Sequence, residues 1–107
     1  MAFVNVARVE EVAAGAIVPV EAEGVKMILY RVGDDYRAVQ RYCVHQRADL
    51  ARMGTLEDGF LVCMMHDWRY HADTGVHELS PETCLTCYPV RVEGEHIQVD
   101  PTPRHPA

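Results

Sequence analysis

Two tight pairs of cysteine and histidine stand in the middle of the 107-residue chain. One residue separates Cys43 from His45. Two residues separate Cys63 from His66, and the stretch between the pairs runs from Gln46 to Val62. Such short spacing places both members of a pair on one loop, and the intervening chain is long enough to bring the two loops face to face. Because thiolates and neutral imidazoles are metal ligands, the pattern predicts a four-ligand metal centre.

Two kinds of centre accept two cysteines and two histidines. Tetrahedral zinc does so, but zinc fingers usually pair Cys with Cys and His with His, with the second pair on a helix. A [2Fe-2S] cluster in which two His replace two Cys on one iron takes one ligand of each kind from each loop. The mixed pairing favours the cluster, and a structural zinc module stands as the alternative.

The composition describes a globular, acidic chain. Hydrophobic residues make up 49% and charged residues 24%, and the formal net charge is −6. A chain of this length forms one domain with a modest core. Its acidity argues against nucleic acid, which is bound through clustered Lys and Arg, and favours a protein partner with a basic patch.

The chain shows no sign of a signal peptide or a membrane span. The opening Met1–Val6 is interrupted by a polar residue at Asn5, and no run of about 18 apolar residues follows. We therefore expect a cytoplasmic protein. In a reducing compartment, cysteines serve as metal ligands or buried thiols more often than as disulfides.

The pattern of short Val-, Ile- and Tyr-rich segments closed by Gly or Asp predicts an all-β fold. Four predicted strands form a base, namely Phe3–Val9, Ile17–Ala22, Val25–Val32 and Tyr36–Gln40. The third of them is apolar on both faces, as a strand covered on both sides would be.

The second half of the chain carries the ligand loops and then returns to the base. Asp58-Gly59 predicts a hairpin within 53–62. We expect strands at Trp68–Ala72 and Val76–Leu79 around the turn 73–75, and a terminal pair of strands at 88–93 and 96–99. The three prolines beyond residue 100 predict a loose tail at about 101–107.

At this point the sequence resembles the Rieske family, from about Val18 to Val99. The resemblance rests on Cys-x-His followed by Cys-x-x-His, on Trp68, on Asp73-Thr74-Gly75 and on Tyr88-Pro89-Val90. It implies a single domain in which antiparallel sheets form a base sandwich or barrel, with an inserted cluster-binding subdomain at about 41–70. It also implies one [2Fe-2S] cluster, with Cys43 and Cys63 on one iron and His45 and His66 on the other, nearer the surface.

Residues near the ligands indicate the subtype. Quinol-oxidising Rieske proteins carry an additional Cys in each loop, where this chain has Ala48 and Met65, and a Ser where it has Trp68. Loss of a hydrogen bond to the cluster sulfurs predicts a midpoint potential in the lower part of the Rieske range of roughly −150 to +300 mV. Tyr70 acts in the other direction if its hydroxyl reaches the sulfur of Cys43 or Cys63.

The same resemblance places further residues around the cluster edge and its docking face. These are Gln46, Arg47, Met64, Met65, Asp67, Trp68, Tyr70 and Pro81. Cys84 and Cys87 precede a strand rather than a helix, which predicts buried or half-exposed thiols rather than a redox pair. A second metal site, formed with His71 or His77, is the alternative.

The resemblance implies a one-electron carrier and not an enzyme. It would take electrons from an NAD(P)H-dependent flavin reductase and deliver them to a terminal aromatic-ring oxygenase, either a dioxygenase or a toluene-type di-iron monooxygenase. We favour the latter, because such ferredoxins have a similar Trp and Cys residues before the Tyr-Pro-Val strand. A small Rieske subunit of an assimilatory nitrite reductase is the alternative within the family.

Overall fold

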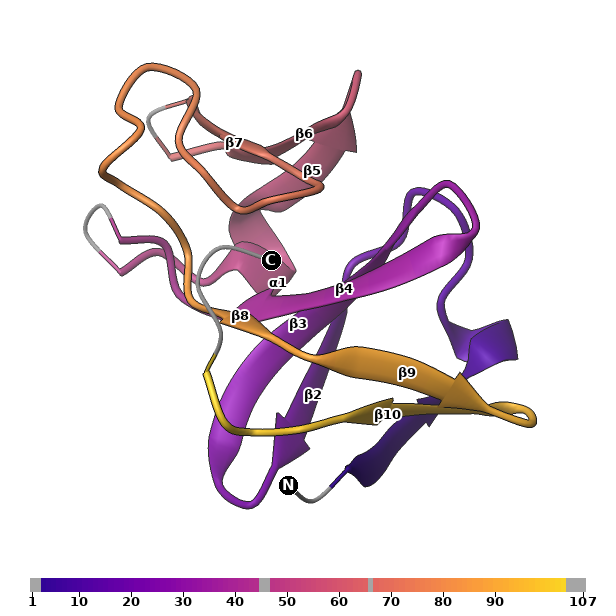
Figure 1. Cartoon of the computed structure of the whole chain (residues 1–107). Helices are drawn as coiled ribbons and strands as arrows, with labels where there is room; N and C mark the ends of the chain where they lie inside the picture. The colour runs from indigo at the N-terminus through magenta and orange to yellow at the C-terminus, as the bar shows by residue number, and fades with distance from the viewer. Residues whose placement is uncertain (1–2, 45–46, 66, 104–107) are drawn as a thin grey trace.

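The computed structural model describes residues 3–44, 47–65 and 67–103, and shows the predicted all-β fold (Figure 1). The strands are β1 (Val4–Arg8), β2 (Val18–Ala22), β3 (Val25–Val32), β4 (Asp35–Gln40), β5 (Gly54–Glu57), β6 (Phe60–Cys63), β7 (Trp68–His71), β8 (Cys87–Tyr88), β9 (Val90–Glu93) and β10 (His96–Val99). A 3-10 turn covers Val9–Glu11, and the short helix α1 covers Leu50–Met53. No described helix is long and apolar enough to cross a membrane.

The described strands form three antiparallel sheets. Two of them, β1-β10-β9 and β2-β3-β4-β8, make up the base. The third, β5-β6-β7, is continuous in sequence and sits over one end of the base in Figure 1. The chain therefore leaves the base after β4, builds the third sheet, and returns to the base at β8, beside the strand it left.

Strand β3 is the centre of the fold because it is buried on both faces. Ile28 and Tyr30 face a buried cluster shared with β6 and β7, whereas Met27 and Leu29 face a second cluster shared with β10. Alternate residues of a strand point to opposite faces, so one strand serves both clusters. Each buried Leu- or Ile-sized side chain stabilises the fold by about 1.5–3 kcal/mol, and the doubly covered strand predicted here is confirmed.

Two side chains of the base hold the third sheet in place. The Tyr30 hydroxyl donates to the carbonyl oxygen of Ala72 at 2.7 Å. Arg37 on β4 pairs with the Asp73 carboxylate at 2.6 Å and also donates to the Asp73 carbonyl at 3.1 Å. The turn that follows β7 is therefore attached to the base by both strands of the β3–β4 hairpin.

One strand prediction was wrong. The segment 76–79 does not form a strand in the structure, although Val76 makes an isolated bridge with Cys84 and His77 makes one with Tyr70. Because Val76 and His77 pair with different segments, the two bridges do not extend into a ladder of hydrogen bonds that would define a strand. The helix α1 was not predicted, because its four residues carry no periodic signal and it depends on capping by Asp49.

Candidate metal centre

The first ligand loop is closed at its base by backbone and side-chain contacts. Cys43 lies three residues beyond β4 and is 1% exposed, and its N–H donates to the Ala48 carbonyl at 2.8 Å. Arg47 takes a positive φ of 54°, which turns the chain back sharply. The buried Cys43 is thus held at the base of a tight loop. His45 and Gln46, predicted on this loop, lie outside the described residues.

Asp49 anchors the end of this loop. Its carboxylate accepts two hydrogen bonds from the Arg41 guanidinium, both at 2.9 Å, and a third from the N–H of Ala51 at 3.0 Å as the cap of α1. The Arg41 hydrogen bond is the main cause of the lowered pKa of Asp49, with Ala51 adding to it and burial opposing it. Arg41 and Asp49 therefore join the two ends of the loop.

The second ligand loop begins directly at the end of a strand. Cys63 is the last residue of β6, is 2% exposed, and pairs in register with Trp68 at the start of β7. Asp67 turns the chain with a positive φ of 55°, and the N–H of Met64 donates to the Met53 carbonyl at 2.8 Å. The loop is thereby attached to the end of α1. His66 lies outside the described residues.

The fold brings the two predicted thiol ligands into one place. Cys43 and Cys63 belong to the same buried cluster, although 19 residues lie between them. Tyr70, fully buried on β7, places its hydroxyl 3.1 Å from the sulfur of Cys43. Burial, followed by the contact with Cys43, raises the pKa of Tyr70, so the hydroxyl keeps its proton and can donate it to a thiolate sulfur.

Aromatic rings pack around this hydroxyl. The Trp68 ring meets His77 edge-on with 4.5 Å between centroids, and His77 meets Tyr70 edge-on at 5.6 Å. The N–H of Leu79 donates to Nδ1 of His77 at 3.1 Å, which fixes the imidazole ring. Trp68 is half-buried and covers Tyr70 rather than projecting into solvent.

The remaining predicted site residues are on the surface. Arg47, Met64, Met65, Asp67 and Pro81 are all exposed. Sequence reasoning missed Val44 and Leu79, two further exposed apolar side chains on the same set of loops. An apolar residue directly after the first Cys is a signal that was available for Val44. No such signal existed for Leu79, because its place on these loops depends on the fold.

The other cysteine pair is buried or half-buried, as predicted. Cys87 is buried in β8, and its thiol donates to the carbonyls of Thr74 and Leu85, each at 3.4 Å. Cys84 is half-buried and bridges Val76. Within the described ranges, no group of three or more Cys, His, Asp or Glu side chains is arranged to hold a metal ion.

The described donors fit sulfur ligation of a cluster. Two thiols are buried among apolar residues, and a hydroxyl is directed at one of them, as hydrogen bonds to cluster sulfurs require. Both loops are attached at their bases by backbone hydrogen bonds, from Cys43 to Ala48 and from Met64 to Met53. The fold and this site together define a protein of antiparallel sheets with a candidate sulfur-ligated metal centre.

The comparisons with known proteins agree. The model of the Rieske [2Fe-2S] domain matches residues 2–89. The ferredoxin subunit of biphenyl dioxygenase from Pseudomonas sp. (strain KKS102) is 30% identical over 102 residues, which cover 94% of this chain and 93% of that protein. The ferredoxin component of an alkene monooxygenase system from Xanthobacter autotrophicus is 25% identical, covering 94% and 83%. The solved ferredoxin of carbazole 1,9a-dioxygenase from Nocardioides aromaticivorans IC177 superposes with a TM-score of 0.84 at 27% identity, over 95% of this chain and all of that one.

The chain belongs to the Rieske [2Fe-2S] family. Its cofactor is one [2Fe-2S] cluster, which decides between the cluster and the zinc alternative. It corresponds to whole ferredoxins, whereas it covers only 29% of the terminal oxygenase of carbazole 1,9a-dioxygenase from Novosphingobium sp. KA1, at a TM-score of 0.82. The protein is therefore an electron-transfer component and not a catalytic oxygenase.

Proposed function

We propose that this cytoplasmic ferredoxin takes single electrons from an NAD(P)H-dependent flavin reductase and passes them to a terminal aromatic-ring oxygenase. The observation that carries the proposal is its end-to-end match to ferredoxin components of biphenyl and naphthalene dioxygenase systems. A solved complex of oxygenase and ferredoxin in carbazole 1,9a-dioxygenase, whose ferredoxin fold this chain shares with a TM-score of 0.83, supports the oxygenase as acceptor.

The proposed ligands are Cys43 and Cys63 on the inner iron and His45 and His66 on the outer iron. Burial of both sulfurs in one cluster supports the inner assignment. When bound, a [2Fe-2S] cluster takes up and releases one electron. The protein side chains exclude water from the sulfurs, keep the loops in place through Asp49, and direct the Tyr70 hydroxyl at Cys43.

We also infer a single domain, with a cluster-binding subdomain at about 41–70 and a tail at about 101–107. The third sheet supports this division, because β5, β6 and β7 follow one another in the chain and form a sheet of their own. The subdomain depends on the base for orientation, through the contacts of Tyr30 and Arg37 with the turn after β7.

The loops around the predicted ligands carry an apolar surface suited to docking. Five large hydrophobic side chains are exposed in the described part of the chain, and four of them lie on these loops, namely Val44, Met64, Met65 and Leu79. Leu79 is 81% exposed and Met64 is 58% exposed. We refer to these four residues as the tip. Methionine adapts its shape to a partner, so the tip supports transient contact with more than one protein.

We expect a midpoint potential in the lower part of the Rieske range. Trp68 occupies the position of a Ser whose hydroxyl would donate to a cluster sulfur, so one donor is missing. Tyr70 compensates in part through its contact with Cys43. Fewer donors disfavour the more negative reduced state and lower the potential.

Purification and reconstitution test the proposed function. The purified protein should be red-brown, contain two irons per chain, and give a Rieske-type EPR signal on reduction. It should then support NAD(P)H-dependent turnover when combined with a flavin reductase and a terminal oxygenase of the biphenyl dioxygenase or di-iron monooxygenase kind. A colourless protein that holds one zinc ion would contradict the cofactor assignment. A coloured protein that reduces nitrite reductase but no oxygenase would favour the nitrite reductase alternative.

A further inference from the structure

A cleft of about 400 Å³ opens directly beside the first ligand loop. It is lined by Lys26, Gln40, Arg41, Tyr42, Cys43, Val44 and Arg47. Its wall is formed by the β3–β4 hairpin and the loop that holds Cys43 and Val44, so it adjoins both the cluster site and the tip. Lys26 is the only lysine in the sequence, and the fold brings it to this place from the start of β3.

The cleft carries uncompensated positive charge in a chain whose net charge is −6. Asp49 neutralises Arg41 through two hydrogen bonds. Lys26 and Arg47 are exposed, and neither has a carboxylate within 4.0 Å among the described residues. Glu21 is the register partner of Lys26 on β2, yet it makes no such ion pair. Arg47 therefore faces solvent beside the loop of Cys43 with no described carboxylate within 4.0 Å, and Lys26 has Glu21 only as a cross-strand neighbour.

Tyr42 forms a platform that holds the guanidinium of Arg47. Arg41 and Arg47 lie over the Tyr42 ring with 5.8 and 6.0 Å from guanidinium carbon to ring centroid. The Gln40 amide nitrogen donates to the Tyr42 carbonyl, and its oxygen accepts from the N–H of Thr86 at 2.7 Å, so the platform is tied to the base. A guanidinium held in this way loses little conformational freedom when it binds a carboxylate.

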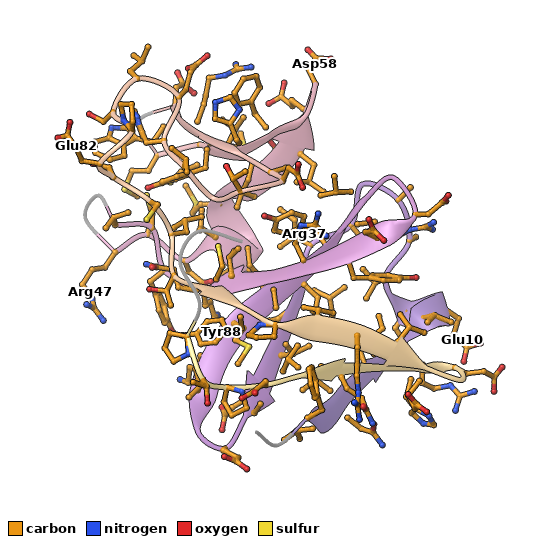
Figure 2. The ribbon with its side chains drawn as sticks, in the orientation of Figure 1. Glu10, Arg37, Arg47, Asp58, Glu82 and Tyr88 are labelled. Carbon is orange, nitrogen blue, oxygen red and sulfur yellow. The ribbon has the colours of Figure 1, made fainter. Side chains whose placement is uncertain are left out.

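The other loops of the tip carry acidic side chains. Asp67 and Glu82 are exposed on the second ligand loop and on the loop that follows β7, whereas Glu78 lies 3.7 Å from the Arg69 guanidinium. Figure 2 shows Glu82 and Arg47 along the left edge of the molecule, Glu82 above Arg47 and each pointing outward. The loops that carry the tip therefore include positive charge at Arg47 and negative charge at Asp67 and Glu82, and this asymmetry favours one orientation toward a charged partner.

We propose that the cleft receives a carboxylate side chain of the terminal oxygenase, which pairs with Arg47 and Lys26 while the tip covers the cluster edge. The inference rests on the proposed function and deepens it. The whole chain repels acidic proteins, yet at this point it selects an acidic group. Such a contact fixes the rotation of the docked ferredoxin and suppresses partners that lack the carboxylate.

Small charged oxidants test the charge of the cleft without any partner. The reduced cluster protein is mixed in a stopped-flow instrument with ferricyanide, a trivalent anion, or with cobalt(III) tris-phenanthroline, a trivalent cation. The Arg47→Gln and Arg91→Gln variants are compared, because both remove one exposed positive charge and Arg91 lies on β9 in the base. Midpoint potentials of both variants correct for any change in driving force.

Arg47→Gln should lower the rate at which ferricyanide oxidises the cluster about fourfold and raise the rate with the cobalt complex about fourfold, at about 0.01 M ionic strength. This size is expected for one charge about 10 Å from a trivalent ion. Arg91→Gln should leave the ratio of the two rates nearly unchanged. Equal ratios of the ferricyanide rate to the cobalt-complex rate in the two variants would overturn the inference. The positive charge of the cleft would then have no effect on the approach of oxidants to the cluster.

A zero-length cross-link tests the occupant. The protein is treated with a water-soluble carbodiimide in the presence of an oxygenase that it reduces in the reconstitution assay. Lys26 offers the only lysine amine, so its amide bond to an oxygenase Asp or Glu should be found by mass spectrometry, and Lys26→Gln should abolish that peptide. Reduction of the oxygenase should fall in Arg47→Gln more than in Arg91→Gln.

The outcomes separate the inference from the proposed function. If no oxygenase is reduced by the wild-type protein, the proposed function fails. If an oxygenase is reduced, but Lys26 gives no cross-link and Arg47→Gln behaves like Arg91→Gln, the function stands and the carboxylate contact is refuted.

Discussion

Removal of one hydroxyl group should lower the midpoint potential of this protein. In Tyr70→Phe the ring stays in its buried place on β7, while the contact of 3.1 Å between the hydroxyl and the Cys43 sulfur is lost. The hydroxyl stays protonated because burial raises the pKa of Tyr70. It therefore donates to the sulfur, and it stabilises the reduced cluster more than the oxidised one because the reduced sulfurs carry more negative charge.

The size of the effect follows from the energy of one hydrogen bond. A buried hydrogen bond contributes about 0.5–1.5 kcal/mol, and one to a charged group about 1.5–3 kcal/mol. A difference of about 1 kcal/mol between the two oxidation states corresponds to about 40 mV, since about 59 mV is a tenfold change in the equilibrium constant for one electron. We expect Tyr70→Phe to lower the potential by about 20–60 mV on these grounds.

Protein-film voltammetry measures this shift, and Tyr30→Phe is the matched control. Tyr30 is also fully buried, but its hydroxyl donates to the Ala72 carbonyl at 2.7 Å and not to a predicted ligand. Tyr30→Phe should reduce the free energy of unfolding by about 1 kcal/mol and leave the potential within a few millivolts of wild type. An unchanged potential in Tyr70→Phe, or equal shifts in both variants, would refute the assigned role of the Tyr70 hydroxyl.

Three further predictions concern the ligands, a turn and a cap. Cys43→Ser should yield protein without the red-brown colour and with little iron, measured by absorption and metal analysis, whereas Cys84→Ser should keep both. Gly75→Ala should lower the free energy of unfolding in urea by about 1–3 kcal/mol, because Gly75 has φ of +79° and an added Cβ would lie 2.9 Å from the sulfur of Cys87; adding Cys87→Ala should restore the steric part of the loss and leave the backbone part. Asp49→Asn should destabilise the protein by about 1 kcal/mol at neutral pH, because it removes the charge that pairs with Arg41 while an Asn side chain can still cap α1. The lowered pKa of Asp49 means that its stabilisation is complete above the unfolded pKa of about 4 and is lost as the pH falls through the folded pKa, so wild type and Asp49→Asn should converge in acid urea titrations.

Much of the fold was predictable because its signals are local. Strand periodicity and turn residues place β1 to β4 within a residue or two of their observed ends, and Asp58-Gly59 forms the tight connection between β5 and β6. The failure at 76–79 has a simple cause. The residue types of this segment are typical of a strand, but its two bridges go to different neighbouring segments. Whether a segment pairs as a strand depends on those neighbours and not on its own residues alone.

The sequence by itself indicated the kind of chemistry. The spacing of Cys43, His45, Cys63 and His66 predicts a metal centre with mixed ligands, because residues one or two apart share a loop wherever the chain goes. Only the tertiary structure decided which groups surround it. The Tyr70 hydroxyl lies 3.1 Å from the Cys43 sulfur, and Lys26 lines the same cleft as Arg47, because β7 and β3 are held in place by burial on both faces of β3. Contacts between residues distant in sequence depend on that register, which no local pattern contains.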